Sequence, residues 1–164
     1  MKSAFIIIDM QKTYLEGIVD KKKIETACEY INYSADLMRK NGQLVVHVQD
    51  IEGMNDLNKS DFDIIEEIKI AESDLNVKKI FSNSFWNTDL EDILKNKGIE
   101  FIIICGFAAE NCVLFTYNGA AERGFKCVIL QNGILSSKDD TVMNIYRDRN
   151  IISYPVIEFI TGSK

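Results

Sequence analysis

The sequence predicts an α/β fold: a doubly wound, mostly parallel six-stranded sheet with helices on both faces, which is a Rossmann-like three-layer sandwich. Short apolar runs alternate along the chain with longer stretches of helical periodicity, and single glycines such as Gly98 and Gly124 close several of these stretches. The run at residues 101–105 is apolar throughout, as in a strand that is buried on both faces of a parallel sheet. We therefore expect parallel strands joined by right-handed crossovers.

The first strand and the first long helix follow from the start of the chain. Ser3–Ile8 is an apolar run that ends at Asp9, and we expect it to be a buried strand. Lys21–Lys40 carries apolar residues at helical spacing and stops at Asn41-Gly42, which is a typical signal for the C-terminus of a helix. The chain is expected to return from this helix into the sheet.

The middle of the chain holds two further strands and a long polar connection. Residues 43–49 (QLVVHVQ) form the second expected strand, and a short third strand is expected within residues 76–81. Residues 50–60 are polar and contain glycine, so we expect a loop there. Residues 62–70 fit a short helix and an irregular segment equally well.

The rest of the chain continues the alternation of helices and strands. We expect helices at residues 87–97, 111–123 and 139–149, and strands at residues 100–105, 125–130 and 151–154. The chain has no internal repeat, no low-complexity tract and no interdomain linker. Residues 1–164 are therefore expected to form a single domain.

Charge and hydropathy exclude several classes of function. The 164 residues carry a net charge of −6, whereas a nucleic-acid binder needs a clustered basic face. No apolar run approaches the length of a membrane span, and the apolar run at the start of the chain is too short for a signal peptide. We therefore expect a cytoplasmic protein that acts on a small-molecule substrate and binds neither nucleic acid nor membrane.

The four cysteines and the single histidine limit the kinds of catalytic and metal-binding site that the chain can form. The cysteines show no CxxC or Cys/His metal spacing, so neither a disulfide framework nor a zinc site is expected. Cys28, Cys105 and Cys127 fall on a helix face or inside strands and are expected to be buried and inert. His47 is the only histidine, which argues against a histidine base and against a metal site with two histidine ligands. We predict no metal and no cofactor.

Three polar residues are expected where strands end. Asp9 closes the first strand, Lys79 lies in or beside the third, and Cys112 follows the fourth by a short turn. In open α/β sheets these strand ends can converge, and a thiol in the first turn of a helix is expected to favour the thiolate. Carboxylate, ammonium and thiol together would form a nucleophilic site. Each residue alone has another possible role: a turn or helix cap for Asp9, solvated surface for Lys79 and core packing for Cys112.

Three motifs together resemble the isochorismatase-like cysteine hydrolases. The sequence DMQ at residues 9–11, after an apolar strand, resembles the DxQ opening of that superfamily. Residues 79–90 (KIFSNSFWNTDL) resemble its lysine segment, and residues 106–113 (GFAAENCV) resemble its glycine-to-cysteine motif. The motifs occur in the family's order and span nearly the whole chain.

This resemblance implies a catalytic triad of Asp9, Lys79 and Cys112, in which Asp9 takes the thiol proton. It also implies a non-proline cis peptide bond between Phe107 and Ala108, which would aim the Ala108 N–H, together with that of Cys112, at an oxyanion. The implied reaction is hydrolysis of an amide or ureido C–N bond through a thioester on Cys112. Because family members commonly form dimers or larger homo-oligomers, we expect the same here.

The chain departs from the metal-binding members of the family. Nicotinamidases bind a metal through an Asp-x-His sequence and a second histidine, whereas no histidine follows Asp50 here. A metal-independent hydrolase of the amidase type is therefore expected. The lysine segment has NSF at residues 83–85 where the family has a Ser-Ala-Phe-like triplet, which would change the polarity of the pocket but not the fold.

Four residues near these motifs are candidates for substrate binding: Gln11, Tyr14, Phe85 and Trp86. Gln11 either orients a loop or contacts the substrate. The three aromatic side chains either wall the pocket or belong to core and interface packing.

Two alternatives to C–N hydrolysis stay open on the same fold. One is hydrolysis of an isochorismate-type vinyl ether, which needs no nucleophilic thiol. The other is a non-catalytic binding protein that keeps the triad as part of its structure. The sequence does not identify the substrate in any of these cases.

Overall fold

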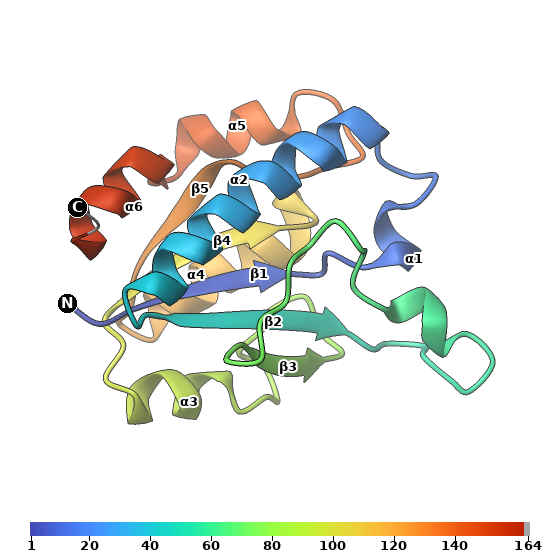
Figure 1. Cartoon of the computed structure of the whole chain (residues 1–164). Helices are drawn as coiled ribbons and strands as arrows, with labels where there is room; N and C mark the ends of the chain where they lie inside the picture. Colours follow the sequence, from blue (N-terminus) through green and yellow to red (C-terminus); the bar gives the residue numbers. More distant parts are fainter. Residues whose placement is uncertain (163–164) are drawn as a thin grey trace.

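The computed structural model describes residues 1–162 and confirms the predicted fold class. A single six-stranded sheet has the strand order β3-β2-β1-β4-β5-β6, and every neighbouring pair of strands is parallel. The strands are β1 (Ser3–Ile8), β2 (Leu44–Asp50), β3 (Leu75–Lys79), β4 (Phe101–Gly106), β5 (Lys126–Ile134) and β6 (Ile151–Ile152). The chain runs outward from β1 in one direction and then from β4 in the other, so the order reverses between β1 and β4 (Figure 1).

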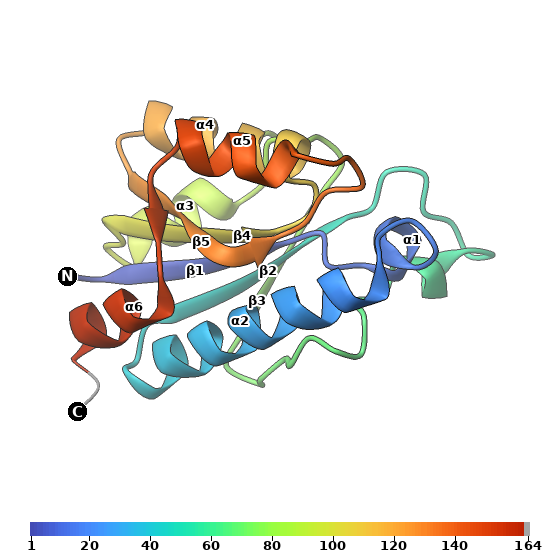
Figure 2. The ribbon, with the colours of Figure 1, turned by 90° about the horizontal axis from the view of Figure 1, so that it is seen from above.

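Helices cover both faces of the sheet. Figure 2 shows α2 and α6 on one face and α3, α4 and α5 on the other. The helices are α1 (Lys12–Leu15), α2 (Lys21–Lys40), α3 (Leu90–Asn96), α4 (Leu114–Glu122), α5 (Thr141–Asp148) and α6 (Tyr154–Thr161), with a 3₁₀ turn at Lys59–Phe62 and a π-helical turn at Ala109–Val113. Among the residues that the structure describes, no helix has the length and apolar character needed to cross a bilayer.

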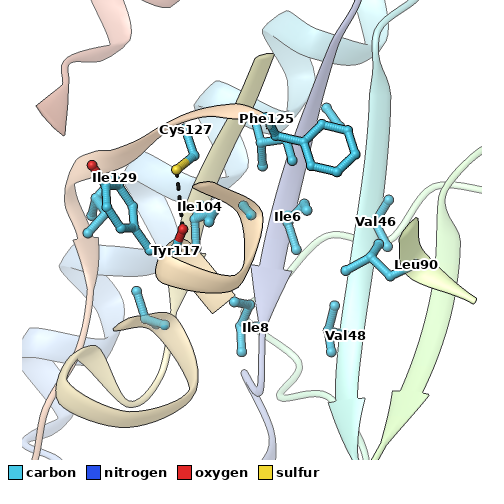
Figure 3. Packing of buried hydrophobic residues seen from close by; sticks show 14 of the residues in the cluster. Ile6, Ile8, Val46, Val48, Leu90, Ile104, Tyr117, Phe125, Cys127 and Ile129 are labelled. Carbon is cyan, nitrogen blue, oxygen red and sulfur yellow. Dashed lines mark hydrogen bonds between the residues drawn. The ribbon is translucent and has the colours of Figure 1, made fainter. Parts of the chain in front are cut away.

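Each face of the sheet has its own apolar core, because alternate residues of a strand point to opposite faces. Ile6 and Ile8 face α3 and α4, whereas Phe5 and Ile7 face α2. Figure 3 shows the first of these cores, in which strand side chains such as Val46 meet residues contributed by the helices. Burial of one such aliphatic side chain contributes about 1.5–3 kcal/mol, so the all-apolar strands fix the layer arrangement.

Two expected elements differ from the structure, and one segment that the sequence left undecided is now assigned. The last strand ends at Ile152 and is followed by α6, which the sequence analysis missed; Pro155 lies in the first turn of α6, where its missing N–H costs nothing. The helix expected at residues 111–123 is a π turn followed by α4, which begins only at Leu114. The undecided segment 62–70 is irregular apart from the last residue of the 3₁₀ turn.

The reversal of strand order places four strand ends side by side. Gly106, at the end of β4, is the register partner of Ile8 at the end of β1. A Cβ on Gly106 would lie 2.0 Å from the Ile8 carbonyl oxygen, so only glycine allows the two chains to approach so closely here. The carboxyl ends of β1, β2, β3 and β4 therefore meet at one edge, where ligands bind in sheets of this type.

Candidate active site

Lys79 is the centre of a buried polar cluster at this edge. Its Nζ lies 2.8 Å from Asp9 Oδ2 and 2.8 Å from Asp50 Oδ2, and 3.5 Å from Cys112 Sγ. The Lys79 side chain is 0 % exposed. Burial alone lowers the pKa of this ammonium, but the facing Asp9 and Cys112 raise it above its ordinary value, so Lys79 is positively charged.

Asp9 is presented to the cluster by an unusual backbone conformation. It follows β1 with φ of +49°, and its N–H donates to the Val48 carbonyl at 2.9 Å. Oδ2 contacts Lys79, whereas Oδ1 is buried without a hydrogen-bond partner among residues 1–162. Burial raises the pKa of Asp9 to about 6, against the lowering effect of Lys79. The carboxylate therefore has an oxygen available to accept a proton, and an elevated basicity.

Cys112 lies in the π turn before α4 and is the only one of the four cysteines that is not buried. A carboxylate oxygen of Asp9 lies within 4.8 Å of its Sγ. Burial and the negative charge of Asp9 raise the pKa of this thiol to about 12, although Lys79 opposes them. Burial and the charge of Asp9 therefore act against the thiolate that a helix start favours. At neutral pH the proton is on sulfur and Asp9 is mostly ionised.

The turn that carries Cys112 is tied to the ends of β1 and β5. Phe107 N–H donates to the Ile8 carbonyl at 2.9 Å, and Ala109 N–H donates to the Leu135 carbonyl at 2.8 Å. Asn111 and Val113 both donate to the Ala108 carbonyl. The peptide bond between Phe107 and Ala108 is cis.

Tyr14 lies beside the cluster, on α1. Its ring stacks on Phe107 with ring centres 6.4 Å apart and meets Phe62 edge-on at 6.3 Å. Burial, and then the charges of Asp50 and Asp9, raise the pKa of the Tyr14 hydroxyl above its ordinary value. The Tyr14 side chain is only half-buried, so part of its surface is accessible from solvent.

The other three substrate-binding candidates have different surroundings. Phe85 is 4 % exposed, stacks on Phe125 and lies under the Arg123 guanidinium, which leaves it little surface for a ligand. Trp86 is exposed on the loop after β3. Gln11 is fully buried, and its amide bonds the backbone of neighbouring segments. Direct substrate contact by any of these residues stays a prediction.

Asp50 is a member of the cluster that the sequence analysis missed. It was assigned to the start of a loop, whereas it is the last residue of β2 and is 7 % exposed. The signal that could have found it is the one used for Asp9: an acid directly after an apolar strand, at the edge where parallel strands end.

The potential metal ligands of the cluster are already paired with an ammonium. Asp9, Asp50 and Cys112 bring potential ligand atoms within 4.8 Å of one another. Lys79, however, lies 2.8 Å from an oxygen of each carboxylate, so an ammonium already fills the cationic role among these side chains and would repel a second cation. His47 is engaged elsewhere, 2.9 Å from Asp74 Oδ2.

Comparisons with known proteins identify the family and agree with the fold. The sequence model of the Isochorismatase domain matches residues 3–152. The isochorismatase family protein YddQ of Bacillus subtilis is 28% identical over 138 residues, which are 80% of this chain and 77% of that protein. A crystal structure of an isochorismatase-like hydrolase from Alkaliphilus metalliredigens superposes with a TM-score of 0.85 at 22% identity, covering 98% of this chain and 99% of the other. The N-carbamoylsarcosine amidase from Thermoplasma acidophilum has a TM-score of 0.81 at 20% identity, covering 94% and 97%.

Proposed function

The chain belongs to the isochorismatase family of hydrolases, and on that premise we propose that it is a metal-independent cysteine hydrolase that cleaves an amide or ureido C–N bond of a small molecule. The observation that supports this most directly is the contact of Lys79 with both Asp9 and Cys112 inside a buried site. A thiol, a base with an unpartnered oxygen and a fixed cation are the parts that nucleophilic catalysis needs. The structural similarity to an amidase supports a C–N bond as the target.

The proposed reaction has two halves that both use Asp9. Cys112 Sγ attacks the carbonyl carbon while Asp9 accepts the thiol proton, and the backbone N–H groups of Ala108 and Cys112 donate to the oxyanion. Outside the helices and strands of residues 1–162, no backbone–backbone hydrogen bond uses the Ala108 N–H. Asp9 then gives its proton to the leaving nitrogen, which departs and leaves a thioester on Cys112. Water attacks the thioester, Asp9 takes the water proton and returns it to sulfur, and the acid product leaves.

Lys79 has two roles in this proposal. Its charge keeps Asp9 ionised in a buried site and stabilises the negative charge that passes from carboxylate to sulfur. Its position also fixes the distance between base and nucleophile, because it contacts both. The raised pKa of the thiol means that proton transfer accompanies attack rather than preceding it.

A mass-spectrometric trap tests the proposed function. The protein is incubated in a chelating buffer with a panel of small amides and ureides, and the peptide that contains Cys112 is weighed after rapid acid quenching. We expect one compound to be turned over and to add its acyl mass to Cys112 alone, with the peptides of the buried Cys28, Cys105 and Cys127 as internal controls. Absence of both adduct and turnover across the panel, or activity that chelation removes and a metal restores, would contradict the proposal.

The pH dependence of kcat/KM should report the pKa of Asp9, the proposed general base. Because Asp9 must be ionised to accept the proton and its pKa is raised to about 6, kcat/KM is expected to rise with pH through about 6 and to fall at lower pH. The profile is measured with the substrate found above. An acid limb near pH 4, where an ordinary aspartate titrates, would show that Asp9 is not the group observed.

Hydrolysis of a vinyl ether is the second candidate function. It is favoured by the same raised pKa of Asp9, since a carboxyl group that is partly protonated near neutral pH can donate a proton to an enol ether. This reaction needs no thiol. Activity that survives loss of the Cys112 sulfur but not loss of the Asp9 carboxyl would select it.

A further inference from the structure

Asp50 lies directly beside Lys79 because the two residues are partners in the parallel register of β2 and β3. Lys79 Nζ is 2.8 Å from Asp50 Oδ2, the same distance that separates it from Asp9 Oδ2. An ammonium has three N–H donors, and the third contact of Nζ is with Cys112 Sγ at 3.5 Å. Asp50, Asp9 and Cys112 thus account for all three donors, and the position of Nζ is determined from three sides.

Asp50 is itself held rigidly. Its N–H donates to Gln11 Oε1 at 2.8 Å, and its carbonyl accepts from Gln11 Nε2 at 2.9 Å. Its Oδ1 accepts from the N–H of Glu52 at 2.8 Å, which leaves Oδ2 for Lys79. The carboxylate cannot turn away from Lys79 without breaking the bond to Glu52. Because Gln11 bonds both the N–H and the carbonyl of Asp50, the buried Gln11 acts on the cluster through Asp50.

Asp50 also changes the balance of charge around the base. Asp9 and Asp50 share the ammonium of Lys79. Lys79 therefore stabilises the ionised form of Asp9 less than it would if Asp9 were its only partner. The charge of Asp50 is one of the effects that raise the pKa of Asp9, although burial is the largest. Without Asp50, the ammonium would pair with Asp9 alone, and Asp9 would become a weaker base.

We propose that Asp50 is a positioning residue of the active site: it holds the Lys79 ammonium between Asp9 and Cys112 and takes up part of its charge, so that Asp9 can accept the thiol proton. The inference rests on the proposed function. It adds Asp50 to the three proposed active-site side chains. It also makes the Lys79 ammonium, and not a metal ion, the partner of the Asp50 carboxylate.

The test compares Asp50→Asn with Glu52→Gln. Asparagine keeps an oxygen that can accept from the Glu52 N–H but has no charge for Lys79, whereas Glu52→Gln makes the same change in net charge at an exposed side chain two residues away. The titration of the Asp9 carboxyl carbon is followed by NMR in both variants and in the unaltered protein. This readout needs no substrate.

We expect the Asp9 midpoint to fall by about one pH unit in Asp50→Asn and to stay in place in Glu52→Gln. With a substrate in hand, kcat should fall by about tenfold or more in Asp50→Asn while KM changes by less than about twofold. An Asp9 midpoint that is the same in both variants would overturn the proposal, and a lower melting temperature in Asp50→Asn without that shift would make Asp50 a structural residue only. If instead the midpoint shifts but the unaltered protein hydrolyses nothing, the proposed function fails and the arrangement of charges stands.

Discussion

Replacing Cys112 with alanine is expected to lower the turnover of amide substrates by about 10⁴-fold or more, because no other thiol or hydroxyl in the cluster can form the covalent intermediate. Steady-state kinetics on the substrate found by trapping measures the loss. Cys28→Ala is the matched control: Cys28 is buried on α2, and burial raises its pKa to about 12, as for Cys112. This control should retain turnover.

The same variant separates the candidate functions. If Cys112→Ala keeps its activity and Asp9→Asn loses it, the thiol is not a nucleophile and the vinyl-ether reaction is favoured. If neither variant differs from the unaltered protein in any assay, the cluster is structural. Thermal unfolding of each variant is recorded alongside, so that a loss of fold is not mistaken for a loss of chemistry.

Replacing Lys79 with methionine is expected to lower the free energy of unfolding at pH 7 by about 3–5 kcal/mol, because it leaves Asp9 and Asp50 as neighbouring buried carboxylates without a counter-ion. Lys78→Met is the control, since Lys78 is the preceding residue and is exposed. Denaturant unfolding measures both. Equal stability of the two variants at pH 7 would show that Lys79 does not neutralise the carboxylates.

The stability of Lys79→Met should also depend on pH in a defined direction. Without the ammonium, which lowers it, the pKa of the buried Asp9 carboxyl in the folded state rises further above its unfolded value, so the folded state binds more protons than the unfolded state. The variant should therefore recover stability as the pH falls from 7 towards about 4 and lose it as the pH rises. Adding Asp50→Asn removes one of the two charges and should restore part of the stability at pH 7.

The fold could be predicted because it depends on local sequence patterns, namely apolar runs, helical periodicity and the residues at helix ends. Ser3–Ile8 and residues 101–105 are apolar on both faces, which only a covered parallel sheet accommodates. Helix α2 was predicted with its observed bounds, since its periodicity and its end at Asn41-Gly42 are local signals. Helix α6 was missed because residues 151–154 were assigned to a strand, and Pro155 was not recognised as a residue of a first helical turn.

Part of the site could be predicted for a similar reason. Asp9, Lys79 and Cys112 each lie where a strand ends, and parallel strands bring their ends to one edge. Asp50 also follows an apolar run, but its contact with Lys79, 29 positions away, comes from the register of two strands, which the sequence does not give. Phe85 lies within the lysine motif in sequence, but the structure buries its ring against Phe125.

The sequence by itself determined the layers of this protein and the three reactive groups, since hydrophobic periodicity and residue type are properties of the chain. Only the tertiary structure decided the pKa values of those groups and the side chains that surround them. Burial is the largest effect that raises the pKa of the Cys112 thiol to about 12 and that of Asp9 to about 6, and it acts against the thiolate that a helix start favours. The pairing of β2 with β3 decided that a second carboxylate, Asp50, shares the ammonium of Lys79. Such effects depend on which atoms exclude water and which charges lie within a few ångströms, and folding fixes both.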